Sequence, residues 1–204
     1  MGARVGGIVL CGGHSTRMGR DKALLEWNAR PLVVHVCEQV SAAVDGPIVV
    51  VAAAGQELPP LPARAELARD LVADQGPLEG LRTGLRTLSG RAELVFVTSV
   101  DAPHLRPELV AALLRRLDDA DAVMPATAGF AHPLTAVYRV SLVPLVEAVI
   151  AEGERRVRRV GERCRAVLLE RDELLADAAL RAVDPALRCL DDVDTPDDLM
   201  RASL

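Results

Sequence analysis

The chain has 204 residues with a formal net charge of −5, and half of its residues are hydrophobic. This length suits one medium-sized domain with a full core, so we expect residues 1–204 to form a single domain. Only 2% of the residues are aromatic, and an acidic chain without aromatic stacking platforms or a basic footprint argues against a nucleic-acid partner.

Strand and helix patterns alternate through the first half of the chain. The apolar run Val5 to Cys11 stops at two glycines and predicts a buried strand. Pro31 to Val44 has apolar residues at helical spacing and begins with a proline suited to a first turn. The patterns that follow predict a strand over 47–53, a loop over 54–64, a strand over 67–72, a helix over 78–88 and a strand over 93–100.

The second half continues in the same way. Its patterns predict helices over 107–117, 140–151 and 154–163, strands over 122–126, 134–139, 166–170 and 187–190, and a closing helix over 195–202. Thr195 is suited to be the N-cap of that last helix, because Asp198 follows three residues later. The alternation predicts a three-layer α/β/α sandwich with a mostly parallel sheet, in which ligands bind beyond the carboxyl ends of the strands.

The first strand leads into a segment rich in glycine, hydroxyl and basic residues. The segment reads Leu10-Cys11-Gly12-Gly13-His14-Ser15-Thr16-Arg17-Met18-Gly19-Arg20-Asp21-Lys22. Glycines after a buried strand let main-chain N–H groups approach a ligand, and Arg17 and Lys22 add permanent positive charge. This chemistry suits a triphosphate and its pyrophosphate leaving group. The spacing fits neither a P-loop nor a dinucleotide fingerprint, and an ordinary strand-to-helix turn with solvated basic residues is the alternative.

Carboxylates at two further places are candidate metal ligands. Asp101 follows the strand over 93–100, where it could hold Mg²⁺ together with triphosphate oxygens, or act only as a loop or capping residue. Asp192 and Asp194 are two residues apart, so on an extended segment they point the same way. They could bring one or two carboxylates to the metal, although Asp194 could equally cap the last helix.

The cysteines and the N-terminal residues indicate the cellular compartment in which the protein resides. Cys11, Cys37, Cys164 and Cys189 lie far apart without CxxC spacing, which favours reduced thiols over disulfides or a zinc site. The N-terminal apolar run is too short for a signal peptide, and no apolar run reaches membrane-spanning length. We therefore expect a cytoplasmic protein with no membrane association.

The chain resembles the molybdenum cofactor guanylyltransferases, within the nucleotidyltransferases that share a Rossmann-like, nucleotide-diphospho-sugar transferase fold. The run 10–22 is similar to the family signature GG-x-S-x-R-M-G-x-D-K. Later similarities are Asp70 with Gly76-Pro77-Leu78-Glu79-Gly80, the run 97–103 ending in Asp101-Ala102-Pro103, His132-Pro133-Leu134, Gly153-Glu154-Arg155-Arg156-Val157, and the run 192–199 around Thr195-Pro196.

The resemblance implies an enzyme that attaches GMP from Mg·GTP to the terminal phosphate of molybdopterin and releases pyrophosphate. It implies Arg17, Lys22 and Asp101 as catalytic residues. Magnesium would bind at Asp101, with Asp194 as a second candidate ligand. The nucleotide contacts would be Leu10, Cys11, Gly12, Gly13, Lys22, Asp70, Gly76, Pro77, Leu78, Gly80 and Asp101. Other proteins of molybdenum cofactor biosynthesis are expected as transient partners. The arginines between positions 155 and 163 are typical of a solvated helix face, although Arg155 and Arg156 could guide the anionic pterin phosphate.

Two departures from the family pattern leave alternatives open. Asp192 and Asp194 stand where this branch usually has asparagines, and alanines at 52–54 stand where an asparagine follows the valine run. One alternative is the same chemistry with CTP and molybdopterin, or with a phospho-sugar or phospho-acid acceptor. Another is a non-catalytic module that binds the nucleotide or delivers the cofactor to a partner enzyme.

Overall fold

The computed structural model describes residues 3–12, 21–70, 76–193, 195 and 198. The strands are β1 (Val5–Leu10), β2 (Glu26–Trp27), β3 (Arg30–Pro31), β4 (Ile48–Ala52), β5 (Ala65–Arg69), β6 (Leu94–Ser99), β7 (Ala122–Thr127), β8 (Phe130–Ala131), β9 (Thr135–Arg139) and β10 (Ala166–Leu169). The α-helices are α1 (Leu32–Ala43), α2 (Pro77–Leu88), α3 (Pro107–Leu114), α4 (Val143–Ala151), α5 (Arg158–Gly161), α6 (Arg171–Leu175) and α7 (Ala178–Val183). Short 3₁₀ turns are η1 (Lys22–Leu24), η2 (Val140–Leu142) and η3 (Arg188–Leu190).

The main sheet has the strand order β10-β7-β9-β6-β1-β4-β5, with β8 paired to β7. Its pairs are parallel at β6–β1, β1–β4, β4–β5 and β7–β10, whereas β9 runs antiparallel to both β6 and β7. The central strands are continuous aliphatic runs because helices bury both of their faces. The predicted fold, a mostly parallel sheet in an α/β sandwich, is confirmed.

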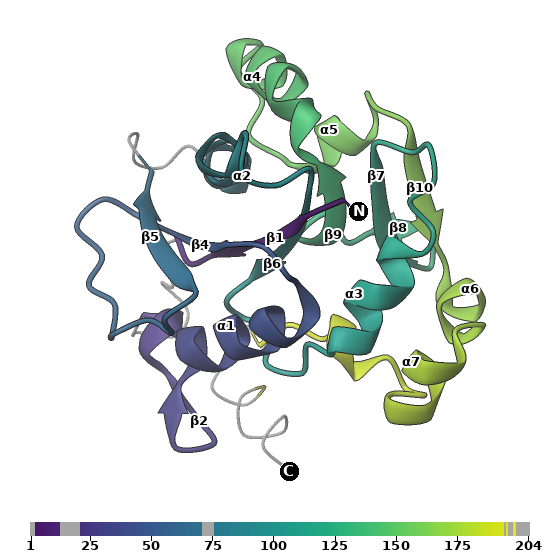
Figure 1. Cartoon of the computed structure of the whole chain (residues 1–204), viewed down its shortest axis with the longest axis horizontal. Coiled ribbons are helices and arrows are strands. Elements are labelled where there is room, and N and C mark those ends of the chain that lie inside the picture. Colours follow the sequence, from purple (N-terminus) through teal and green to yellow (C-terminus); the bar gives the residue numbers. More distant parts are fainter. Residues whose placement is uncertain (1–2, 13–20, 71–75, 194, 196–197, 199–204) are drawn as a thin grey trace.

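Helices cover the sheet in two layers (Figure 1). The layer containing α2, α4 and α5 lies on one face, and α1, α3, α6 and α7 lie on the other. Helix α2 packs very closely on the central strand β1, because a methyl group built on Gly84 would lie 2.7 Å from the Ile8 side chain. A glycine at this point lets the N-terminal end of α2 reach the carboxyl end of β1.

Two sequence predictions are wrong in the C-terminal third. The segment over 187–190 is not a strand: Leu187 adopts a left-handed conformation and the turn η3 follows. The carboxylate of Asp184 accepts the main-chain N–H groups of Arg188 at 2.9 Å and Cys189 at 2.8 Å, so these donors are used in a turn instead of a ladder. The helix predicted over 154–163 is only α5, because the Glu154 side chain accepts the N–H groups of Arg155 and Arg156 and holds them in a turn.

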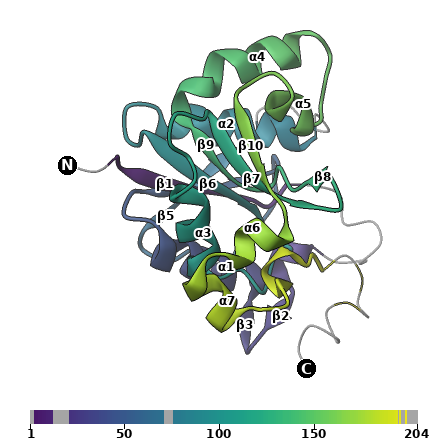
Figure 2. The same ribbon diagram turned by 90° about the vertical axis from the view of Figure 1, so that its right-hand side faces the viewer.

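Some elements have no counterpart in the sequence predictions. They are the hairpin β2–β3, the short strand β8, and helices α6 and α7. Figure 2 shows β8 on the side of the molecule opposite the N-terminal end of β1, and the hairpin at the bottom, below α1. All four cysteines are free, as predicted. No helix among the described residues has the length and apolar character needed to span a membrane.

Candidate functional site

The carboxyl ends of three neighbouring strands meet at one edge of the sheet. Leu10 at the end of β1 pairs with Val51 in β4 and with Ser99 in β6. Just beyond, the Cys11 N–H donates to the Val51 carbonyl at 2.8 Å, and the Val100 N–H donates to the Leu10 carbonyl at 3.0 Å. The chain that continues β1 at Gly12 and the chain that continues β6 at Asp101 therefore leave the sheet side by side, as parallel strands require.

Lys22 and Asp101 form an ion pair at this edge, although 79 residues separate them in the sequence. The Lys22 ammonium donates to Asp101 Oδ2 at 2.9 Å, and the side chains are only 15% and 17% exposed. Lys22 begins the turn η1, whose N-cap Asp21 accepts the Ala23 N–H at 2.9 Å. The fold thus brings together a cation and a carboxylate that the sequence suggested for phosphate and metal binding.

One carboxylate oxygen of Asp101 can coordinate a hard cation. Its Oδ1 atom is buried and makes no hydrogen bond within the part of the chain that the structure describes. A buried carboxylate oxygen without a partner is costly unless a ligand satisfies it, and carboxylate oxygen is what Mg²⁺ prefers. The Val193 N–H donates to the main-chain carbonyl of Asp101 at 2.8 Å, which places the segment of Asp192 beside the Asp101 turn. Asp101 therefore fits a magnesium ligand.

Asp70 lies between the glycines of two candidate loops. Methyl groups built on Gly12 and on Gly80 would each lie 3.7 Å from Asp70 Oδ2, and the Asp70 N–H donates to the Ala52 carbonyl at 2.9 Å. Burial raises the pKa of Asp70, and a side-chain hydrogen bond with Thr83 partly offsets this effect. Its Oδ1 atom is also buried without a partner among the described residues. A second acceptor is thus directed at the same edge of the sheet.

The loop that opens helix α2 packs against a distant segment. Gly76 has φ of +76°, and a methyl group on it would lie 3.3 Å from both Cβ and the carbonyl oxygen of Arg155. Pro77 takes the first helical position, and the Leu78 N–H donates to the Arg155 carbonyl at 3.3 Å. The side chain of Leu78 is buried, so only its main chain is available near the surface.

Leu10 and Cys11 turn their side chains into the core. Burial raises the pKa of the Cys11 thiol well above its usual range, and the nearby Cys37, Asp21 and Asp101 raise it further. A thiol held protonated is a poor nucleophile. The geometry agrees with the sequence, which offers no covalent mechanism, and leaves Gly12 as the first exposed residue after β1.

Several predicted site residues lie outside the described residues: Gly13, Arg17 and Asp194. Those that the structure brings together are Leu10, Cys11, Gly12, Lys22, Asp70, Gly80 and Asp101, with Gly76, Pro77 and Leu78 at the adjoining helix start. Sequence reasoning missed the Asp21 cap and Gln56, whose amide nitrogen donates to Asp21 Oδ2 at 2.8 Å. An Asp directly before a Lys at a helix start is a capping signal, whereas a lone Gln in a loop gives none.

A hollow of about 380 Å³ adjoins the Asp101 turn. Its lining is His104, Arg188, Leu190, Asp191, Asp192, Val193 and Asp198. The Nη2 atom of Arg188 lies 3.3 Å from His104 Nε2, and the His104 ring packs edge-on against Trp27. Burial and the nearby Arg188 lower the pKa of His104, so the ring is neutral at pH 7 and Arg188 supplies the positive charge.

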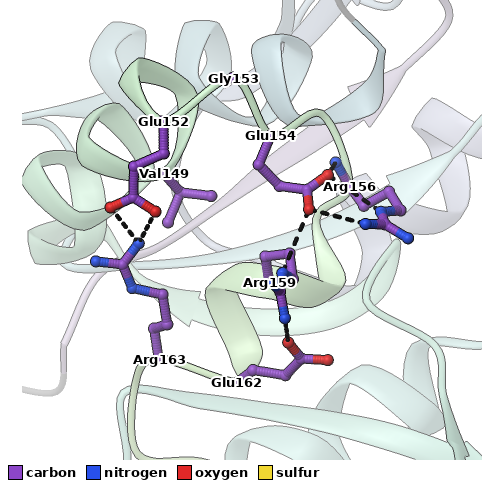
Figure 3. Close-up of a pocket in the computed structure, with 8 residues that line it drawn as sticks. All are labelled: Val149, Glu152, Gly153, Glu154, Arg156, Arg159, Glu162 and Arg163. Atoms are coloured by element: carbon purple, nitrogen blue, oxygen red, sulfur yellow. Dashed lines mark hydrogen bonds and ion pairs between the residues drawn. The ribbon is translucent and has the colours of Figure 1, made fainter.

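A larger hollow, of about 680 Å³, lies on the surface around α4 and α5 (Figure 3). Arginine and glutamate side chains alternate around it and pair with one another: Arg156 with Glu154 at 3.0 Å, Arg159 with Glu162 at 2.7 Å, and Arg163 with Glu152 at 2.6 Å. Hydrogen bonds from the Arg156 side chain and from the main chain of Arg155 and Arg156 lower the pKa of Glu154 to about 2. The charges balance, so size alone does not make this hollow an anion site.

Comparisons with known proteins place this geometry in a family. A family model described as the MobA-like NTP transferase domain matches residues 7–171. A relative from Mycobacterium marinum, named "Probable molybdenum cofactor guanylyltransferase", is 40% identical over 156 residues, which cover 74% of this chain and 76% of the relative. The relative of the same name from Mycobacterium ulcerans is 41% identical over 155 residues, covering 74% and 75% of the two chains.

The fold is similar to that of a solved molybdopterin-guanine dinucleotide biosynthesis protein A from Archaeoglobus fulgidus. The TM-score is 0.76 at 25% identity, with 97% of this chain and 96% of the other covered.

Proposed function

Because the chain belongs to the MobA-like NTP transferase family, we propose that it transfers GMP from GTP to molybdopterin. The products are the guanine dinucleotide form of the cofactor and pyrophosphate. The name of the curated relatives supports this choice of substrates. The observation that carries the proposal is the Lys22–Asp101 pair at the carboxyl ends of β1 and β6, with a buried, unsatisfied oxygen on Asp101.

In this proposal the acceptor phosphate oxygen attacks the α-phosphorus in line, and the bond between the α-phosphorus and the oxygen bridging to the β-phosphorus breaks. The enzyme needs no covalent intermediate, since positioning and charge neutralisation supply most of the rate enhancement of such transfers. Lys22 and Arg17 neutralise the β- and γ-phosphates and the departing pyrophosphate. Asp101 would hold the magnesium ion, with Asp194 as a second candidate ligand, and the metal would neutralise charge on the triphosphate.

We assign the nucleoside to the edge formed by Gly12, Asp70 and Gly80. The Asp70 carboxylate, already held between the two glycines, can accept hydrogen bonds from N–H or O–H groups of the nucleoside. The loop Gly76-Pro77-Leu78 flanks the same edge through its main chain. Alanines at 52–54 contribute no polar side chain here, so Asp70 and main-chain groups would select the base.

We assign the acceptor's phosphate to the hollow beside the Asp101 turn. Its described lining holds Arg188, which donates to His104, and the carboxylates of Asp191, Asp192 and Asp198. The Arg188 end of the hollow is therefore the part that suits a phosphate. Arg156 pairs with Glu154 at 3.0 Å, and its role in guiding the pterin phosphate stays a prediction. The acceptor would thus approach from the side of β6 and η3.

The aspartates at 192 and 194 favour one alternative, in which the chemistry is the same but CTP or another phosphorylated acceptor is used. The deciding experiment incubates the protein with Mg²⁺, molybdopterin and each of the four triphosphates, and measures pyrophosphate and the dinucleotide product. Release of pyrophosphate with GTP, at least ten times faster than with the others, is the expected result. A preference for CTP would instead identify the protein as a cytidylyltransferase. Nucleotide binding without pyrophosphate release would identify it as a non-catalytic module.

A further inference from the structure

The carboxamide of Gln56, in the loop after β4, is fully engaged inside the protein. Its oxygen Oε1 accepts the Ala53 N–H at 3.0 Å. Its nitrogen Nε2 donates to the Cys11 carbonyl at 3.1 Å and to Asp21 Oδ2 at 2.8 Å. A primary amide has two N–H donors, so both are used here. Gln56 therefore cannot donate to a nucleotide base without giving up one of these bonds.

The two acceptors of Gln56 lie near the two ends of the Gly-rich run 10–22. Cys11 comes directly before Gly12-Gly13, and Asp21 comes directly before Lys22. One side chain thus holds the two ends of this run at a fixed distance from each other. Glutamate could not replace this amide, because an ionised carboxylate offers no donor and would face Asp21 with the same charge.

Through Asp21 this contact reaches Lys22. Asp21 Oδ1 caps the turn η1 by accepting the Ala23 N–H at 2.9 Å, while Oδ2 is held by Gln56. With both oxygens fixed, the direction in which η1 starts is fixed as well. Lys22 is the first residue of that turn, and its ammonium lies 2.9 Å from Asp101 Oδ2.

Gln56 is itself anchored from the neighbouring strand. The Arg69 guanidinium donates from Nη1 to the carbonyls of Ala53 at 3.0 Å and Gln56 at 2.9 Å. Arg69 ends β5 and directly precedes Asp70. The loop that carries Gln56 is therefore tied to the ends of β1, β4 and β5, where the candidate site lies.

From these contacts we infer that Gln56 is a positioning residue: it holds Asp21, and through Asp21 it sets Lys22 for the triphosphate. The inference takes its substrate, the triphosphate, from the proposed function.

The substitution Gln56→Glu breaks the hydrogen bond to Asp21 with little change in volume, and Gln56→Ala breaks it without adding charge. Gln39→Glu, on helix α1, adds the same charge outside the site and is the matched control.

The test measures two quantities for each variant. Calorimetry gives the affinity for Mg·GTP, and NMR gives the hydrogen-exchange rates of the Ala23, Leu24 and Leu25 amides in the free protein. Loss of a hydrogen bond to a charged group typically costs about a factor of ten in an equilibrium. We expect Gln56→Glu and Gln56→Ala to bind GTP about ten-fold more weakly and to exchange these three amides faster, whereas Gln39→Glu should leave both quantities unchanged.

A rescue variant separates positioning from a general loss of structure. In the double variant Gln56→Glu with Asp21→Asn, the amide and the carboxylate exchange places, so one hydrogen bond returns and asparagine still caps η1. Recovery to within about three-fold of the wild-type affinity is expected. Unchanged affinity or unchanged amide exchange in Gln56→Glu, or no recovery in the double variant, overturns the inference. If the wild type itself binds no GTP, the proposed function fails, and the amide exchange alone still decides whether Gln56 positions Lys22.

Discussion

The surface around α4 and α5 and the sheet edge at the ends of β1 and β6 both carry several charged side chains, but these charges are satisfied in different ways. Around α4 and α5, three arginines and three glutamates line the larger hollow and pair with one another in solvent. At the carboxyl ends of β1 and β6, the charges are fewer and mostly buried, and one oxygen each of Asp70 and Asp101 lacks a partner among the described residues. Paired surface charges contribute little, whereas buried unsatisfied oxygens require a ligand. The comparison shows that unsatisfied polar atoms mark the candidate site better than hollow size does.

The largest effect is expected at Asp101. Asp101→Asn keeps the shape of the side chain but removes the metal-binding charge and leaves Lys22 facing a neutral group. We expect kcat/KM for pyrophosphate release to fall about 10³-fold, or roughly 4 kcal/mol of transition-state stabilisation. The control is Asp121→Asn, which removes a carboxylate paired with Arg165 at the start of β7 and should change kcat/KM less than about two-fold. If kcat/KM fell by a comparable factor in both variants, the partly buried charge of Asp101 and the exposed, paired charge of Asp121 would not differ in their effect on the reaction.

Asp70→Asn should weaken binding but stabilise the fold. Because burial raises the pKa of Asp70 above its unfolded-state value, the ionised form opposes folding. Stability then falls as the pH rises from the unfolded pKa of 3.8 through the higher folded pKa. Asparagine removes this penalty, so its melting temperature should exceed that of the wild type at neutral pH and match it near pH 3. We expect about ten-fold weaker GTP binding by calorimetry. A lower melting temperature at pH 7 would contradict this account of Asp70.

Gly76→Ala and Gly90→Ala form a matched pair. The two glycines have φ of +76° and +73°, but only Gly76 has neighbours, since nothing lies within 4 Å of a methyl group on Gly90. Both substitutions should lower the free energy of unfolding by about 1–2 kcal/mol through backbone strain. Gly76→Ala should also press on Arg155 and raise KM for GTP about three-fold, because small displacements at the site are amplified in the rate. Equal KM values would mean that the Arg155 contact has no bearing on the nucleotide.

The smallest effect is expected at Arg156. Arg156→Gln should leave the free energy of unfolding nearly unchanged, because solvent screens an exposed ion pair, and should change kcat by less than about two-fold. The pKa of Glu154 should rise only slightly above about 2, as NMR titration would show, because the Arg156 side chain is lost while the main-chain N–H groups of Arg155 and Arg156 still donate to this carboxylate. Glu154 contributes stability above pH 4.5 that is lost as the pH falls through about 2, and this contribution should be slightly smaller in the variant. A large loss of turnover would show that the surface cluster takes part in the reaction.

The sequence was informative where one physical rule dominates. Continuous aliphatic runs predicted β1, β4 and β6, and the residues just beyond them supplied Gly12, Lys22 and Asp101. The sequence was less informative where contacts between residues far apart in the chain determine the local conformation. The apolar segment over 187–190 is a turn because Asp184 takes its N–H groups. The two-residue strands of the hairpin β2–β3 are too short to show a period.

The site was predictable to a similar extent. Asp70 and Gly80 were identified through family resemblance. That Gly80 lies close to the Asp70 Oδ2 atom, however, depends on how α2 packs on β1. Gln56 could not be identified, since its three hydrogen bonds join residues 3, 35 and 45 positions away and a glutamine in a loop has no distinctive pattern. That Arg156 faces Glu154 while the Arg155 main chain contacts the α2 loop also required the fold.

The most direct test of the central claim is a crystal structure with a non-hydrolysable GTP analogue and Mn²⁺. The account predicts an anomalous manganese peak about 2.2 Å from Asp101 Oδ1, with the triphosphate against Lys22 and the nucleoside beside Asp70. An analogue seated in the hollow of α4 and α5, with Lys22 still paired to Asp101 and no metal at its carboxylate, would contradict it.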